Sequence, residues 1–271
     1  MKQYIQIEFQ NISVEQSDLL LAALSEIGFE GFEEEVNSLK AFIPAADFDE
    51  AGIKEIAARN NLSFNQTIIG ETNWNAVWES NFQPVLVDDF VAVRADFHEP
   101  IAGVKHEVII TPKMSFGTGH HATTHMMIQQ MQAIDFTSKA VFDFGTGTGI
   151  LAILAEKLGA AAIMAVDNDD WSITNTAENL ERNSCRKVEL KKVDTAEGEG
   201  RYDVILANIN KNVILDNLSS LIKQLASGGN LLLSGLLEAD ETDILTATGK
   251  FPLRYNGKIT MAGWICLRFC R

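Results

Sequence analysis

The residues best suited to chemistry lie in a glycine-rich turn and at the end of the next apolar run. Residues 141–149 read Val-Phe-Asp-Phe-Gly-Thr-Gly-Thr-Gly, and Asp167 ends the following apolar run. A glycine turn after an apolar strand lets the backbone come close to a ligand, and a carboxylate after the next strand can accept hydrogen bonds from a ribose diol. We therefore expect a ligand with a ribose at Gly145, Gly147 and Asp167.

The glycine spacing separates two classes of cofactor. Dinucleotide binders use G-x-G-x-x-G, which here would need a third glycine at position 150, where the chain has Ile150. The third glycine is Gly149, and G-x-G-x-G preceded by Asp143 is typical of methyltransferases that use S-adenosylmethionine (AdoMet). We expect Asp143 to order the turn rather than to perform chemistry. A purely structural turn and a dinucleotide oxidoreductase are the alternatives.

A second polar cluster precedes a predicted helix. Residues 114–125 read Met-Ser-Phe-Gly-Thr-Gly-His-His-Ala-Thr-Thr-His, and the helix is expected to start near Thr123 with Thr123 or Thr124 as its cap. The N–H groups at such a start can hold a carboxylate, here that of the methionine moiety of AdoMet. His121 and His125 have the spacing of a helical zinc site. No third ligand is evident, so we expect no metal.

An asparagine at the end of a later strand is the predicted catalytic residue. Asn208 follows the apolar run of residues 203–207, at the edge of an open α/β sheet where ligands bind. Its amide offers an acceptor and a donor, which suits an amine nucleophile. Ile209-Asn210-Lys211 stands where enzymes that methylate planar nitrogen carry Pro-Pro-aromatic. Asn208 as a loop cap is the alternative, and Asp194 is either an adenine contact or a turn residue.

The first 70 residues predict a small binding module. Residues 13–27 have helical periodicity behind a capping box formed by Ser13 and Gln16. The predicted elements alternate as β-α-β-β-α-β, the ferredoxin-like arrangement. Their ranges are 2–10, 13–27, 29–36, 39–43, 47–60 and 62–69. We expect residues 1–70 to form a substrate-recognition domain.

The remainder predicts a linker and a catalytic α/β domain. Trp74 and Trp78 would share one face of a short linker helix over residues 71–84. From residue 85 to 271 we expect a doubly wound seven-stranded sheet of the methyltransferase type. Two strand-like runs at 90–95 and 106–111 precede strands at 140–144, 162–167, 188–193, 203–207 and 229–234 and helices at 149–158, 171–183 and 212–226.

The end of the chain also distinguishes a methyltransferase sheet from a dinucleotide-binding sheet. Asn256-Gly257 lies between apolar runs and predicts a terminal antiparallel hairpin. Such a hairpin on a parallel sheet is typical of methyltransferases and foreign to dinucleotide-binding domains.

Composition limits the compartment and the partners. The formal net charge is −15, which argues against nucleic-acid binding. Residues 1–70 hold 12 acidic and 4 basic side chains, a net charge of −8 that would attract a basic protein. An ordinary acidic surface is the alternative. Three cysteines without a C-x-x-C pair, no signal peptide and no apolar run long enough for a membrane span indicate a cytoplasmic protein. We expect a monomer.

Several motifs together resemble one family. Phe-Gly-Thr-Gly-x-His-x-Thr-Thr at 116–124 is the distinctive one, followed by the turn at 143–152, Val-Asp-Asn-Asp at 166–169, Glu-Asn at 178–179 and Ala-Asn-Ile at 207–209. The chain resembles the methyltransferases that modify large-subunit ribosomal protein eleven, and the Trp-rich linker at 74–84 matches as well.

The resemblance implies an activity and a set of contacts. The activity is methylation of lysine ε-amines, and of an N-terminal α-amine, on that ribosomal protein, docked by the N-terminal domain. The residues expected at AdoMet are Phe116, Thr124, Asp143, Gly145, Gly147, Asp167 and Asn208. A nitrogen methyltransferase acting on RNA or another basic protein, and a non-catalytic AdoMet-binding protein, remain as alternatives.

Overall fold

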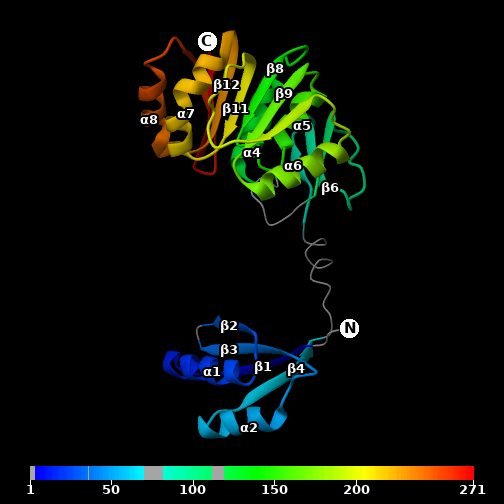
Figure 1. Cartoon of the computed structure of the whole chain (residues 1–271), viewed down its shortest axis with the longest axis vertical. Helices are drawn as coiled ribbons and strands as arrows, with labels where there is room; N and C mark the ends of the chain where they lie inside the picture. The colour runs from blue at the N-terminus through cyan, green and yellow to red at the C-terminus, as the bar shows by residue number, and fades with distance from the viewer. Residues whose placement is uncertain (1–3, 36, 70–81, 112–118) are drawn as a thin grey trace. The chain divides into compact units, whose positions relative to one another are not determined.

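The computed structural model describes residues 4–35, 37–69, 82–111 and 119–271. The chain divides into two compact units, Met1–Asn81 and Phe82–Arg271, drawn in Figure 1. Most of the expected linker over 71–84 lies outside the described residues, so the linker helix and the domain limits stay predictions. In the part of the chain that is described, no helix has the length and apolar character needed to cross a bilayer.

The first unit has the predicted β-α-β-β-α-β order. Its antiparallel sheet runs β2-β3-β1-β4, which confirms the ferredoxin-like expectation. Helix α1 begins behind the predicted capping box, where Ser13 Oγ accepts from Gln16 N and Gln16 Oε1 accepts from Ser13 N. The elements are β1 Tyr4–Gln10, α1 Val14–Glu26, β2 Gly31–Glu35, β3 Ser38–Pro44, α2 Glu50–Arg59 and β4 Phe64–Ile69.

Alternation along the strands gives this first sheet one buried and one open face. Ile5, Ile7 and Phe9 of β1 point into a core that also contains Leu20 of α1 and Ile53 of α2. The residues between them on β1 are only partly buried. Both helices therefore cover one face, and among residues 4–35 and 37–69 no helix covers the other face.

The second unit contains a seven-stranded sheet in the order β10-β9-β8-β11-β12-β14-β13. Neighbouring strands are parallel from β10 to β12, and β14 and β13 are antiparallel. This confirms the doubly wound methyltransferase sheet. Its elements are β8 Ala140–Phe144, α5 Ile150–Lys157, β9 Ala162–Asp167, α6 Asp170–Arg182, β10 Val188–Lys192, β11 Tyr202–Asn208, α7 Lys211–Gln224, β12 Leu225–Leu237, α8 Glu241–Thr248, β13 Arg254–Met261 and β14 Trp264–Cys270.

Adjacent strand residues enter two separate cores, one on each face of this sheet. Val141 and Leu206 pack with α4 (Ala122–Gln132) and α5, whereas Phe142 and Ile205 pack with α7 and α8. Buried on both faces, β8 and β11 read as nearly continuous apolar runs, as parallel strands do. Figure 1 shows α7 and α8 on the side of the sheet away from α5 and α6.

A separate three-stranded sheet lies against the outer side of α4 and α5, which the sequence had shown only as two strand-like runs. Its order is β5-β6-β7, and its apolar residues share one core with those helices. Arg94 is buried in it and forms an ion pair with Glu107, Nε to Oε1 at 3.1 Å. The strands are β5 Val85–Val87, β6 Val91–Ala95 and β7 His106–Ile110.

The terminal hairpin is present, but its turn is not at the predicted Asn256-Gly257. Met261 pairs with Trp264, so the two-residue turn is Ala262-Gly263, with φ of 50° and 80°. Two positive φ angles are those of a type I′ turn, whose twist matches that of the strands. At Asn256-Gly257 the register of β13 shifts, so that this dipeptide forms a bulge instead.

Candidate active site

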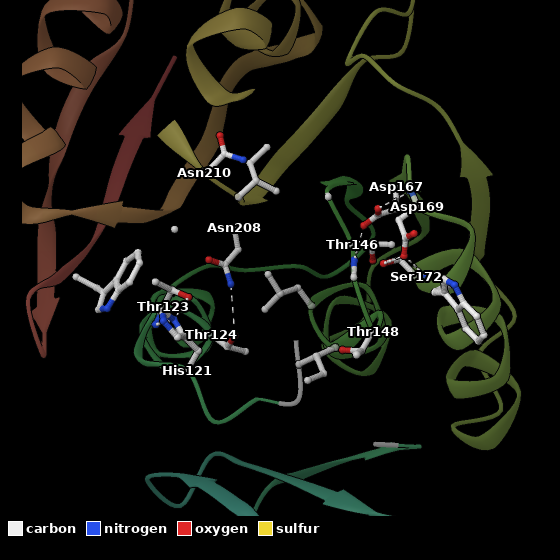
Figure 2. A pocket seen from close by; sticks show the side chains of 18 residues that line it. His121, Thr123, Thr124, Thr146, Thr148, Asp167, Asp169, Ser172, Asn208 and Asn210 are labelled. Atoms are coloured by element: carbon white, nitrogen blue, oxygen red, sulfur yellow. Dashed lines mark hydrogen bonds between the residues drawn. The ribbon is translucent and has the colours of Figure 1, made fainter. Parts of the chain in front are cut away.

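A cavity of about 1080 Å³ opens where β8, β9 and β11 end (Figure 2). Ligands of open α/β sheets bind at this edge, because the loops diverge there. Five segments and the terminal hairpin contribute its walls. Among the residues lining it are His121, Thr123, Thr124, Gly145, Thr146, Gly147, Thr148, Asp167, Asp169, Trp171, Ser172, Asn208, Ile209, Asn210, Gly235 and Trp264.

The glycine turn forms the floor with bare backbone. Gly145 has a φ of 78°, and a Cβ there would lie 2.2 Å from Cγ2 of Ile209. The N–H groups of Gly145 and Thr146 both donate to Val166 O, each at 2.9 Å, which fixes the turn on β9. Glycine is therefore required at position 145 by both the backbone conformation and the space available.

Asp167 joins the turn to the next helix. Its Oδ2 accepts from Gly147 N at 2.9 Å, and its Oδ1 accepts from Asp169 N at 3.1 Å. Asp169 caps α6 through a bond from Ser172 N at 2.8 Å. Each oxygen of the Asp167 carboxylate accepts one hydrogen bond and keeps a lone pair, and Figure 2 shows Asp167 beside Thr146. Asp167 is thus held rigidly in a position that suits a ribose diol.

Asp143 lies behind the turn rather than in the wall of the cavity. It is only 1% exposed, and its Oδ2 accepts from Thr146 Oγ1 at 2.7 Å. Its Oδ1 is buried without a hydrogen-bond partner among the described residues. Burial, helped by the nearby Asp167 charge, raises the pKa of Asp143 to about 7. This placement suits the expected role of Asp143 in ordering the turn.

The polar start of α4 forms a second wall. His121, not Thr123 or Thr124, is the N-cap: its Nδ1 accepts from Thr123 N at 3.3 Å, and the helix begins at Ala122. The prediction that Thr123 or Thr124 caps the helix is therefore wrong, because the His121 imidazole accepts the N–H that a threonine hydroxyl was expected to accept. Thr124 is left to face the cavity, where it meets Asn208.

Asn208 reaches from the end of β11 to α4. Its Nδ2 lies 3.4 Å from Thr124 Oγ1, as the dashed line in Figure 2 shows. Because the amide nitrogen of Asn208 donates to Thr124 on α4, its Oδ1 remains an acceptor in the cavity. Asn210 serves a different purpose, because its Oδ1 accepts from Val213 N and caps α7.

The structure brings together most, not all, of the residues predicted for the site. Thr124, Gly145, Gly147, Asp167 and Asn208 line the cavity, and Asp143 lies directly behind it. Phe116 is outside the described residues. Their contacts with AdoMet stay predictions. Exposed Asp194 is not among the residues lining the cavity. Within the described residues, no group of three or more His, Cys, Asp or Glu side chains is arranged to hold a metal ion.

Two tryptophans that the sequence analysis does not connect with the site also line the cavity. Trp264 follows the hairpin turn and packs edge-on against His121, with ring centroids 4.6 Å apart. Trp171 in the first turn of α6 is 74% exposed. Neither tryptophan carries a local signal that points to the site, because the turn before Trp264 begins at an alanine and Trp171 belongs to no motif.

The residues present fit AdoMet. A side chain at Gly145 would collide with Ile209, which also lines the cavity, and Asp167 offers carboxylate oxygens for a ribose. Thr124 Oγ1, which accepts from Asn208, keeps a hydroxyl hydrogen that can be donated to a carboxylate at the other end of the cavity. A doubly wound sheet with an antiparallel terminal hairpin and this site defines an AdoMet-dependent methyltransferase.

Comparison with known proteins identifies the family. The profile of the family described as ribosomal protein L11 methyltransferase (PrmA) matches residues 5–271, and the chain belongs to that family. A ribosomal protein L11 methyltransferase of Porphyromonas gingivalis is 39% identical over 93% of this chain and 90% of its own length. One from Chlorobaculum tepidum is 38% identical over 88% of this chain and 86% of its own.

A solved structure supports the same assignment. The ribosomal protein L11 methylase of Lactobacillus delbrueckii is similar with a TM-score of 0.65 and 28% identity. The similarity covers 70% of this chain and 99% of that one. The predicted family and cofactor are therefore confirmed.

Proposed function

We propose that the chain methylates amines of ribosomal protein L11, namely lysine ε-amines and the N-terminal α-amine. The observation that carries this proposal is the geometry of Asn208, whose amide nitrogen is directed to Thr124 while its oxygen remains available in the cavity. A neutral acceptor at this point suits an alkyl amine. The Ile209-Asn210-Lys211 sequence that follows lacks the aromatic side chain that would stack on a planar base or amide.

The chain's task is to align a neutral amine. When bound, AdoMet supplies an electrophilic methyl group on sulfur. Removing the proton from a lysine with a pKa near 10.4 at pH 7 costs roughly 4–5 kcal/mol, at about 1.36 kcal/mol per pKa unit. Desolvation in the cavity lowers that pKa. The proton leaves to solvent, Asn208 Oδ1 accepts a remaining N–H, and the amine lone pair is aimed along the line of transfer. AdoMet, held by the glycine turn and Asp167, would supply the methyl group to this lone pair and would keep the electron pair of its C–S bond.

The cavity wall beside Asn208 suits a substrate that returns for further methyl groups. Trp264 and His121 present aromatic surface there. An alkylated ammonium is attracted to the face of a tryptophan ring within about 6 Å of its centroid. Mono- and dimethylated amines regain a lone pair on deprotonation, so more than one methyl group can be added to the same nitrogen.

The open sheet face of the first unit is the proposed docking surface. Glu8 on β1 and Glu33 on β2 both pair with Lys40 on the intervening strand β3, so that the three side chains form one row. Phe42 and Gln6 form the next row on the same face. An acidic row beside a partly exposed aromatic ring suits a basic protein, which this charge would steer and orient.

The replacement Asn208→Ala tests the catalytic role. It removes the acceptor that orders the amine and leaves the glycine turn and Asp167 unchanged. We expect kcat to fall about 100-fold or more, as when one preorganised hydrogen-bonding group is lost. The Kd for AdoMet, measured by calorimetry, should change by less than about tenfold, because a single neutral hydrogen bond is worth about 0.5–1.5 kcal/mol. A variant with full turnover would rule out this role.

The acceptor class is tested separately with ribosomes from cells that lack this activity. Tritiated AdoMet is added with the protein, and label is counted in the protein and RNA fractions. We expect label in the protein fraction, in L11. Label in RNA would favour an RNA methyltransferase instead.

A further inference from the structure

Helix α6 and its C-cap carry three asparagines spaced four residues apart, at positions 175, 179 and 183. Asn175 and Asn179 are fully buried, and Asn183 is half-buried. An amide buried without partners loses its hydrogen bonds to water, so buried amides are normally bonded to specific groups. The partners of Asn179 are the unusual ones, because they belong to two different parts of the molecule.

Asn179 connects the glycine turn to the small three-stranded sheet. Its Nδ2 donates to Thr148 O at 2.8 Å, and its Oδ1 accepts from Thr111 N at 2.7 Å, directly after β7. A backbone carbonyl needs a donor and a backbone N–H needs an acceptor, so only a side chain with both can make this bridge. The amide of Asn179 has both groups, a nitrogen that donates and an oxygen that accepts.

A second bond from the same helix supports the adjacent peptide of the turn. Thr176 Oγ1 donates to Gly147 O at 2.6 Å. Two successive carbonyls of the turn are therefore held by α6. In a trans peptide the N–H points away from the C=O, so fixing these carbonyls also fixes the directions of the N–H groups of Thr148 and Gly149.

We propose that Asn179 is a positioning residue for AdoMet: it holds the glycine turn in its binding conformation by tying Thr148 to the end of β7. Asn179 does not line the cavity, so it acts through the turn and not by contact. The same turn carries the Gly147 N–H that orients Asp167. This inference concerns AdoMet affinity, which can be measured without a methyl acceptor, and it therefore stands apart from the proposed substrate.

A matched pair of substitutions tests the proposal. Asn179→Asp keeps the acceptor for Thr111 N and loses the donor to Thr148 O. Asn183→Asp is the control, because Asn183 bonds to Ile109 N at 3.0 Å and to Ile109 O at 2.6 Å, on the same strand but without reaching the turn. Both place a carboxylate on the same helix face against β7. Affinity for AdoMet is measured by calorimetry and unfolding by thermal denaturation of the ligand-free chain.

We expect Asn179→Asp to raise the Kd for AdoMet about tenfold, the loss of a preorganised contact worth about 1.4 kcal/mol. Asn183→Asp should change the Kd less than about twofold, although both lower the unfolding temperature. At saturating AdoMet the kcat of Asn179→Asp should stay near that of the wild type while the KM for AdoMet rises. A smaller neutral variant, Asn179→Ala, should raise the Kd similarly and serves if the aspartate variant does not fold. An equal change of Kd at positions 179 and 183, or no change at 179, would overturn the proposal.

Discussion

At the scale of single residues, the candidate cofactor site consists of the backbone of the glycine turn and two carboxylates, of which Asp167 lines the cavity and Asp143 lies behind it. Gly145, Gly147, Asp143 and Asp167 could be predicted from the sequence, because a glycine turn between apolar runs is a local pattern. Asn179 was seen in the sequence only as part of a motif. Its role depends on two backbone groups distant along the chain, which no local pattern shows.

Gly145→Ala should abolish most AdoMet affinity. The new methyl group would lie 2.2 Å from Ile209 Cγ2, at a φ of 78°. A non-glycine residue with this φ costs roughly 1–2 kcal/mol, and the clash adds to it. We expect the Kd from calorimetry to rise at least about tenfold, which corresponds to about 1.4 kcal/mol.

The control for Gly145→Ala is Gly159→Ala. Gly159 has a φ of 98°, but its Cβ would meet the nearest atom at an ordinary 3.6 Å, and it follows the end of α5 opposite to the turn. This variant should lose stability without losing AdoMet affinity. Equal losses of affinity in both variants would contradict the account of the turn.

Asp143→Asn should change how stability depends on pH. The pKa of Asp143 rises from 3.8 in the unfolded chain to about 7 in the folded chain because of burial. The folded state therefore binds this proton more tightly, and the contribution of Asp143 to the free energy of unfolding falls as the pH rises from about 4 to about 7. At about 1.36 kcal/mol per pKa unit, the loss reaches about 4 kcal/mol at most.

Asparagine carries no proton to lose, so the variant should be the more stable protein at pH 8, by an amount that shrinks toward pH 4. Urea unfolding of ligand-free protein at several pH values measures this difference. Asp135→Asn is the control. A hydrogen bond from Thr137 N lowers the pKa of Asp135, so this variant should lose stability relative to the wild type as the pH rises. A pH-independent difference for Asp143→Asn would contradict the pKa assignment.

At the scale of elements, the helices and parallel strands could be predicted from the periodicity of apolar residues. The wrong predictions, the hairpin turn and the cap of α4, lie where contacts between distant residues decide the local structure. The hairpin turn was expected at Asn256-Gly257 and lies at Ala262-Gly263. Alanine carries no turn signal, and the pairing of β13 with β14 determines which residues reverse the chain. The cap of α4 was misassigned in the same way, because an imidazole replaced a hydroxyl.

Ala262→Asn should stabilise the protein. Ala262 has a φ of 50°, which asparagine tolerates better than alanine. We expect a gain of roughly 0.5–1 kcal/mol in the free energy of unfolding, read from urea unfolding. Asn256→Ala should change it by less than about 0.5 kcal/mol, as for an ordinary surface position. The opposite ranking would place the turn at the dipeptide that the sequence suggested.

At the scale of the whole molecule, the substrate follows from family membership, and the proposed docking on the first unit rests on charge. The net charge of −15 includes −8 from residues 1–70, a share far above that segment's share of the length. Composition could predict an attraction to basic proteins. It could not identify the partner, because electrostatic attraction is not specific to one sequence.

Salt should therefore weaken the encounter with L11 and leave the chemistry unchanged. Raising ionic strength from about 0.01 to about 0.15 M shortens the Debye length from about 30 to about 8 Å, so kcat/KM for L11 should fall severalfold at nearly constant kcat. Glu33→Lys on the open face should reduce kcat/KM, whereas Glu197→Lys, an exposed position in the second unit, should change it little. An equal effect of both variants would contradict docking on the first unit.

Methyl transfer to purified, unmodified L11 tests the central claim most directly. Tritiated AdoMet, the protein and L11 are incubated together, and the product is analysed by mass spectrometry. The account predicts mass gains in multiples of one methyl group, located on lysines or the N-terminal amine, and their loss with Asn208→Ala. No transfer to L11, in a preparation whose AdoMet binding is demonstrated by calorimetry, would contradict it.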